Sequence, residues 1–274
     1  MSIGDAEIKT QERVIRFFKD PEILGYQYIG NLSDYQNKNI KEDRLRQYLR
    51  LKGYADKLID AAIMQLQQEA GNLSRGVYDA NKTVYSRLKY GIPVSESPEK
   101  PPVTVQLVDE EKPLNNDFAI AEEVTVVEQS EKRPDLVVYL NGIAVAVIEL
   151  KRSSISVSEG IRQNLTNQKN SFIQSFFTTM QFCMAGNESE GLRYGTLLTG
   201  EKFYMEWKDD GFKEHEEERD PVDVRISKTC EGIENKLLKQ IYAMFDKERF
   251  IDLIMNFVCL LYTSPSPRDK RQSR

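Results

Sequence analysis

The sequence predicts an α/β fold: a mixed β-sheet flanked by helices, with a mostly helical region before it. Residues 5–90 carry apolar side chains largely at helical spacing. After the proline- and charge-rich stretch "SESPEKPP" at 95–102, the chain becomes rich in β-branched residues in alternating patterns. Helical periodicity returns at 158–184 and 228–256, so helical segments lie on both sides of the strands in the chain.

Helices dominate the first hundred residues. One helix is expected over 5–20, ended by Pro21, and another ends at Gly91 after "NKTVYSRLKY". Between them, "LGYQYIGNLSD" predicts a short strand or turn, and residues 40–69 form a long helical stretch interrupted at Gly53. The side chains of that stretch expected in the core are Leu45, Tyr48, Leu49, Leu58, Ala62, Met64 and Leu66.

Strands dominate the middle of the chain. "VTVQLVD" and "FAIAEEVTVVEQ" are predicted strands, and "RPDLVVYLNGIAVAVIELKRS" at 133–153 is a predicted hairpin with Asn141-Gly142 as its turn. A helix is expected over 158–184, in one piece or in two. "LRYGTLLTGEKFYMEWKDDG" then predicts two more strands with a turn at Gly200.

Composition excludes several classes of protein. The formal net charge of −5 does not suit a domain that binds nucleic acid through a broad basic surface, so contact with a polyanion needs a local patch or a metal ion. The single histidine, His215, excludes zinc sites built from histidine pairs and leaves one residue for any histidine-dependent nucleophile. No glycine-rich nucleotide motif occurs.

Cysteine usage predicts a cytoplasmic protein. Cys183, Cys230 and Cys259 are far apart, odd in number and without zinc spacing, so a reducing compartment fits best. The N-terminus has no apolar signal core, and the longest apolar runs are too short to span a bilayer. No membrane partner is expected.

The ends of the predicted hairpin carry Asp135, Glu149 and Lys151. Glu149 and Lys151 lie two residues apart and point to one face of a strand. With a strict two-residue turn, Asp135 faces away from Glu149. A three-residue loop, or a bulge within 143–149, brings both carboxylates to one face. The sequence permits both registers, and only the second makes a site.

Two carboxylates on one face of an apolar hairpin are costly without a partner, because like charges repel and burial penalises them. A divalent cation such as Mg²⁺ removes this cost, and the carbonyl of Leu150 is a further oxygen ligand for it. Lys151 can then hold an attacking water or stabilise a pentavalent phosphorus. The plain alternative is a surface ion pair, but the strand holding Glu149 is apolar on both faces, which predicts a central strand.

The next predicted helix carries a polar stripe. Glu159, Gln163 and Asn167 follow at i, i+4 and i+8, and this spacing alone favours a solvated face. After an acid-lysine strand, however, Gln163 is also placed to touch metal-site ligands or the DNA backbone. With Gln163, the basic residues Arg152 and Arg162 are the candidate DNA-binding residues.

The hairpin resembles the PD-(D/E)-x-K nuclease motif as it occurs in the R subunit (HsdR) of type I restriction-modification enzymes. "TQERVIRFF", "NDFAIAEEVTV", "GIRQNLTNQK", "FFTTMQFCMAGNESEGLRYGT" and "EKFYMEWK" are similar to the N-terminal part of such subunits, in the same order. The resemblance implies a restriction-endonuclease-like core that hydrolyses phosphodiester bonds in double-stranded DNA. It further implies that Asp135 and Glu149 bind Mg²⁺ and that Lys151 is catalytic.

The resemblance has one departure and further implications. Many members carry Q-x-x-x-Y on the following helix, which here reads Gln163 to Asn167, without the tyrosine. Related nucleases often have an upstream glutamate in the site, for which Glu12 and Glu7 compete. The partners implied are double-stranded DNA and the methyltransferase (M) and specificity (S) subunits. ATP binding belongs to motor domains of the full-length subunit, which this sequence does not include.

Four segments are expected: a mostly helical region at 1–100, the nuclease core at 101–215, a helical linker toward the motors at 216–260, and a tail at 261–274. The tail is basic and rich in serine and proline, as in a disordered linker or a cloning remnant. Two other functions stay open: a motor-independent repair or defence nuclease, and a non-catalytic docking module that uses the acidic runs "EHEEERD" and "VDEEK".

Overall fold

The computed structural model describes residues 3–97, 99–208 and 220–258. His215 and the tail at 261–274 lie outside the described residues, so the expectations for them stay predictions. Within the part of the chain that is described, none of the helices combines the length and apolar character that a transmembrane segment requires.

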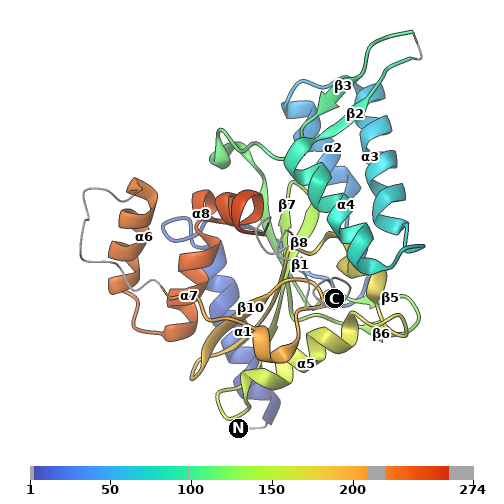
Figure 1. Ribbon diagram of the computed structural model, residues 1–274. Helices are drawn as coiled ribbons and strands as arrows, with labels where there is room; N and C mark the ends of the chain where they lie inside the picture. Colours follow the sequence, from blue (N-terminus) through green and yellow to red (C-terminus); the bar gives the residue numbers. More distant parts are fainter. Residues whose placement is uncertain (1–2, 98, 209–219, 259–274) are drawn as a thin grey trace, which may run out of the picture.

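A six-stranded mixed sheet forms the centre of the fold, with helices around it (Figure 1). In spatial order its strands are β1 (Gln27–Asn31), β4 (Phe118–Glu122), β7 (Leu136–Leu140), β8 (Ile143–Leu150), β9 (Phe182–Asn187) and β10 (Gly191–Gly195). β1 pairs with β4 and β8 with β9 in parallel, and the other neighbours are antiparallel. The predicted class, a mixed sheet flanked by helices, is confirmed.

Two short antiparallel ribbons lie outside this sheet. β2 (Ile92–Val94) pairs with β3 (Val103–Val105), and this ribbon projects from the upper part of the molecule in Figure 1. β5 (Val126–Val127) pairs with β6 (Glu131–Lys132), close to the end of the sheet where β7 begins.

Helices α2 (Glu42–Leu51), α3 (Asp56–Gly71) and α4 (Val77–Tyr90) gather at one end of the sheet, while α1 (Ile3–Lys19) runs beside β1 (Figure 1). The predicted break between α2 and α3 is confirmed: Gly53 has a φ of +84°, a left-handed conformation that glycine adopts at little cost.

The two faces of the sheet bury different clusters. Leu136, Val138 and Leu140 belong to the larger core cluster, whereas Val137 and Tyr139 belong to a smaller one on the opposite face. This alternation follows from the period of two in a β-strand. Both faces of β7 and β8 are therefore buried, which explains their almost continuous apolar sequence.

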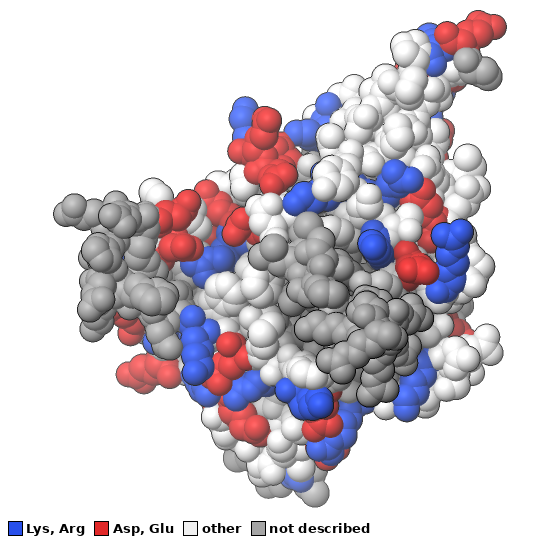
Figure 2. All heavy atoms as spheres, in the orientation of Figure 1, with Lys and Arg blue, Asp and Glu red and all other residues white. Residues whose placement is uncertain are grey.

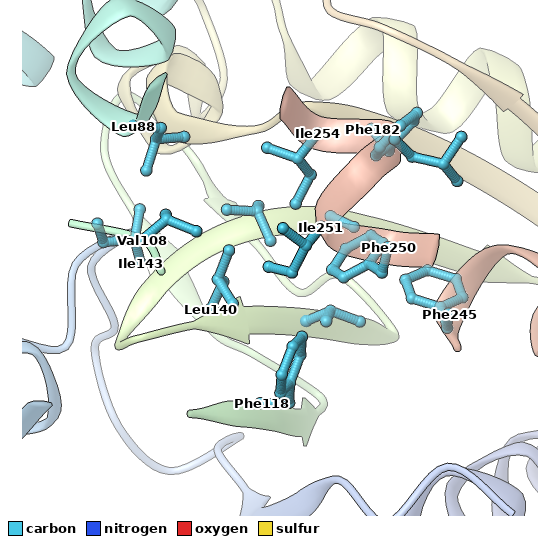
Figure 3. Packing of buried hydrophobic residues seen from close by; sticks show 14 of the residues in the cluster. Leu88, Val108, Phe118, Leu140, Ile143, Phe182, Phe245, Phe250, Ile251 and Ile254 are labelled. Carbon is cyan, nitrogen blue, oxygen red and sulfur yellow. The ribbon is translucent and has the colours of Figure 1, made fainter. Parts of the chain in front are cut away.

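Helices α6 (Pro221–Glu231), α7 (Lys236–Phe245) and α8 (Lys247–Asp252) follow the sheet in the chain, and a π-helical turn (Leu253–Phe257) ends the series. Figure 3 shows Phe245, Phe250 and Ile251 packed over Phe118 and Leu140 of the sheet. Helices expected in a linker thus complete the larger core. The predicted domain boundaries themselves stay predictions.

On the opposite face, α5 (Val157–Asn167) packs against β8 and β9. Its first residue Val157 and Ile161 bury against Ala185 of β9. The side chain of Ser156 caps the helix by accepting a hydrogen bond from the N–H of Ser158. This packing sets α5 beside the end of β8 that carries Glu149.

Two expectations about secondary structure are wrong. Residues 182–184 begin strand β9 instead of ending a helix, because this run is fully buried between β8 and β10 and completes their hydrogen bonding. The helix before it ends at Asn167, and a 3₁₀ turn (Gln174–Thr179) leads into the strand. No second strand forms in the described residues after Gly200: a 3₁₀ turn stands there, with one isolated bridge to β10.

The expected core position of Met64 is also wrong, since its side chain is 57% exposed. Ala62 and Leu66, which lie one helical turn apart, are fully buried. Met64 lies two residues from each of them, about 200° around the helix, and so faces solvent. The other predicted core side chains of α2 and α3 are buried.

Candidate active site

The register of the β7–β8 hairpin decides whether Asp135 and Glu149 meet. The turn is a strict two-residue turn, with Leu140 opposite Ile143 and positive φ angles of 52° and 82° at Asn141 and Gly142. A bulge then shifts the register of β8: Val138 lies opposite Ala146, but Tyr139 lies opposite Ala144, which leaves Val145 unpaired.

The bulge restores the parity that the short turn would have lost. Val145 and Ala146, although consecutive, both belong to the larger core cluster, and alternation then resumes with Val147 on the other face. Leu136 consequently pairs with Ile148, so that Asp135 and Glu149 come to the same face, beside α5. Of the registers that the sequence permits, the structure has the one that makes a site.

Asp135 is held by the backbone of the neighbouring strand. Its Oδ2 accepts a hydrogen bond of 2.7 Å from the N–H of Leu150 and lies 3.9 Å from Nζ of Lys151. Lys151 Nζ also donates to the Leu150 carbonyl at 2.9 Å and to Glu7 Oε1 at 3.1 Å. The three motif residues therefore converge at one end of the hairpin.

Glu149 is the most deeply buried acid of the group, with no exposed surface. Its Oε2 accepts a hydrogen bond of 2.6 Å from Gln163 Nε2 of α5. Its Oε1 is buried and has no hydrogen-bond partner among the described residues. A buried carboxylate oxygen without a donor is costly, so this atom marks a place where a proton or a cation is favoured.

The pKa values reflect the crowding of these charges. Burial raises the pKa of Asp135 to about 6, although Lys151 and the Leu150 N–H oppose the shift. Burial, together with the charge of Asp135, raises the pKa of Glu149 well above its ordinary value. Burial lowers the pKa of Lys151, but the charges of Asp135, Glu149 and Glu7 outweigh it and leave that pKa above its ordinary value.

The donor set suits Mg²⁺. Asp135, Glu149 and the Leu150 carbonyl are hard oxygen ligands, and Mg²⁺ usually takes one or two carboxylates and keeps several waters. Within the described ranges, no cluster of three or more His, Cys, Asp and Glu side chains could hold a metal ion. The unpartnered Oε1 of Glu149 and the raised carboxylate pKa values fit a cation at this position.

The other predicted residues surround this group unevenly. Glu7, at the start of α1, reaches Lys151, whereas Glu12 lies on the exposed side of the same helix. Gln163 contacts Glu149 as one interpretation of the sequence expected. Arg162 points outward and pairs with Glu159 at 2.7 Å and Glu201 at 3.0 Å.

The solvated stripe that spacing alone favoured on α5 is wrong for two of its three members. Asn167 is only 2% exposed, because its helix ends against the buried 3₁₀ turn that precedes β9, and Gln163 turns toward the hairpin. Glu159 does face solvent. Arg152, directly after Lys151, is partly exposed near the same edge.

Sequence reasoning missed Glu123 and Gln11. The N–H of Glu123 donates to the Asp135 carbonyl at 2.8 Å, and the Glu123 charge helps to raise the pKa of both Asp135 and Glu149. Gln11 of α1 is buried and donates to Glu122 and Glu123 at 3.0 and 3.1 Å. The signal was the pair of acids that ends the apolar run "FAIAEE".

Gly160 sets how closely α5 approaches the hairpin. A Cβ at this position would lie 2.9 Å from Ala185 Cβ and 3.4 Å from Glu149 Cβ. Gly160→Ala is therefore expected to push α5 outward, loosen the contact between Gln163 and Glu149, and slow any DNA cleavage by roughly tenfold. Gly71→Ala, which meets nothing within 4 Å at the end of α3, is the control. Equal cleavage rates for the two variants would contradict this role of Gly160.

A cleft of about 410 Å³ adjoins the motif residues and is lined by residues that include Lys151 and Gln163. A larger hollow of about 580 Å³ lies between α3 and α4, where Arg87 and Glu69 pair, and contains none of the predicted site residues.

Comparison with known proteins bears on the whole of this region. The family described as type I restriction enzyme R protein N terminus matches residues 7–203, which include all the strands of the central sheet and the converging motif. A search of curated proteins found no match. The chain belongs to the family of type I restriction enzyme R protein N-terminal regions.

Proposed function

We propose that this chain is the Mg²⁺-dependent endonuclease module of a type I restriction enzyme R subunit, which hydrolyses phosphodiester bonds in double-stranded DNA. The observation that carries the proposal is the convergence of Asp135, Glu149 and Lys151 on one face, with a buried Glu149 oxygen that has no donor. Acids forced together in this way suit a metal-assisted hydrolase better than a structural ion pair.

Each residue has a separate task in this proposal. Asp135, Glu149 and the Leu150 carbonyl would hold Mg²⁺, which when bound stabilises negative charge on a phosphate. The Leu150 N–H orients Asp135, and Gln163 orients Glu149. Lys151 places an ammonium next to both carboxylates, where it can neutralise charge that develops on the phosphate during cleavage.

Contact with DNA would be local. On the face drawn in Figure 2, acidic and basic side chains are interspersed wherever residues are described, and the chain is acidic overall. Gln163, Arg152 and Arg162 remain the proposed DNA-binding residues, although Arg162 must exchange its carboxylate partners for phosphate. Weak, salt-sensitive binding is expected of the chain alone, with the M and S subunits supplying site recognition.

The test compares two preparations: the chain alone, and a full R subunit that contains this sequence, assembled with M and S subunits. Cleavage that needs Mg²⁺ and the assembled complex supports the proposal. Cleavage by the chain alone with Mg²⁺ and without ATP would favour a motor-independent nuclease instead. Absence of Mg²⁺ and Mn²⁺ binding by calorimetry would reject the nuclease and favour a docking module.

A further inference from the structure

The cleft beside the motif has a cationic wall that the nuclease motif does not supply. Besides Lys151 and Gln163, the cleft is lined by Lys132, which comes from β6 of the separate β5–β6 ribbon. Glu159 is the acid on the cleft wall, and Arg162 pairs with it at 2.7 Å. The lysines therefore leave a net positive lining next to Asp135 and Glu149.

Lys132 is held over the cleft by an aromatic ring. Its Nζ lies 4.8 Å from the centroid of Phe172, a distance typical of a cation–π contact. Among the described residues, no carboxylate lies within ion-pair distance of Lys132. The ammonium thus has its stem supported and its charge uncompensated, which suits an anion from outside the protein.

The ribbon that carries Lys132 is anchored to the segment that carries Phe172. The Glu128 carboxylate accepts hydrogen bonds from the N–H and the hydroxyl of Ser175, at 3.0 and 2.6 Å, and from the Phe176 N–H at 2.9 Å. The Gln129 N–H donates to the Phe172 carbonyl at 3.2 Å. Lys132 and its supporting ring therefore keep a common position relative to α5 and the cleft.

We infer that Lys132 binds a DNA phosphate next to the one that is cut, as a substrate-binding residue outside the Asp135, Glu149 and Lys151 group. The inference rests on the proposed function, because it takes DNA as the ligand of the cleft. A duplex presents regularly spaced phosphates, so a second cation beside the cleavage centre can hold the backbone while Lys151 acts at the scissile position.

The experiment measures binding of a fluorescently labelled DNA duplex to the full chain over a range of salt concentrations. Ca²⁺ replaces Mg²⁺, since it takes the same kind of oxygen ligands. Lys132→Ala is expected to weaken binding for every duplex sequence and to lower the slope of log affinity against log salt by about 0.9, the loss of one phosphate contact. Lys132→Arg should keep the slope.

Lys228→Ala, which removes the same charge from an exposed position on α6, is the matched control and should bind like the wild type. Equal salt slopes for Lys132→Ala and Lys228→Ala would overturn the inference, as would failure of the wild-type chain to bind duplex at low salt.

The two proposals fail separately. If Lys132→Ala loses the phosphate contact but the assembled enzyme still cuts DNA after Asp135→Asn, the cleavage centre is misassigned and the contact stands. If Asp135→Asn stops cleavage and Lys132→Ala binds normally, the cleavage centre stands and the contact does not exist.

Discussion

The double variant Asp135→Asn with Glu149→Gln is expected to lose Mg²⁺ binding and DNA cleavage while gaining stability in the absence of metal. The amides keep the shapes of the side chains and an acceptor for the Leu150 N–H and for Gln163. They remove both charges that would bind the cation, so cleavage by the assembled enzyme should fall on the order of a thousandfold or more.

The gain in stability should depend on pH. Burial raises the pKa of Asp135 from 3.8 to about 6, and Glu149 is shifted in the same direction. Such carboxyls favour the folded state below the pKa of the unfolded chain, and this contribution is lost as pH rises through the folded pKa. The variant should therefore match the wild type below about pH 4 and exceed it by roughly 2–3 kcal/mol above pH 6.

Denaturant unfolding at several pH values, with and without Mg²⁺, measures this effect. Mg²⁺ should stabilise the wild type at neutral pH and leave the variant unchanged, because a ligand that binds the folded state raises the free energy of unfolding.

Asp109→Asn is a control with the opposite sign. Burial raises the pKa of Asp109, but Lys52, at 2.6 Å, and further donors outweigh it and keep that pKa below its ordinary value. Loss of this carboxylate should destabilise the protein at neutral pH. A wild type that is as stable at pH 7 as at pH 4 relative to the double variant would contradict the assignment of the buried pair.

Lys151→Ala is expected to slow DNA cleavage by about a hundredfold to a thousandfold without abolishing Mg²⁺ binding. The side chain is only 15% exposed, and its ammonium lies among Asp135, Glu7 and the Leu150 carbonyl. Removal of one oriented cation or donor from a reaction centre typically has an effect of this size. The metal ligands proposed here are untouched by the change.

Single-turnover cleavage by the assembled enzyme and calorimetry with Mg²⁺ separate the two effects. Lys151→Arg should rescue little, because the planar guanidinium does not reproduce the compact ammonium between two carboxylates. Lys52→Ala, which removes an ion-paired lysine far along the chain, should cost stability without loss of cleavage. A Lys151→Ala enzyme that cuts within twofold of the wild-type rate would remove Lys151 from the reaction.

Much of the hairpin could be predicted from the sequence because its determinants are local. Asn141-Gly142 accepts the two positive φ angles of a two-residue turn, and the apolar run in β8 indicates a strand buried on both faces. Strand β9 was missed because "FCMAGN" has no alternation, and only its position between β8 and β10 makes it a strand. Met64 was misplaced because its helical face was assigned without its neighbours.

The candidate site divides in the same way. The types of residue and their order, an acid before one apolar strand and an acid and a lysine at the end of the next, are properties of the sequence, and so is membership of the family. Only the tertiary structure decided that Asp135 and Glu149 share a face, because a bulge at Val145 depends on how β8 packs and has no signature in its run of small apolar residues.

Contacts across long separations in the chain were decided by tertiary structure as well. Glu7 was chosen over Glu12 by the side of α1 that packs against the sheet, and Gln163 reaches Glu149 because Gly160 lets the helix come close. Local sequence sets which groups can do chemistry. Packing of distant segments sets which of those groups meet, since it determines the faces that each helix and strand buries.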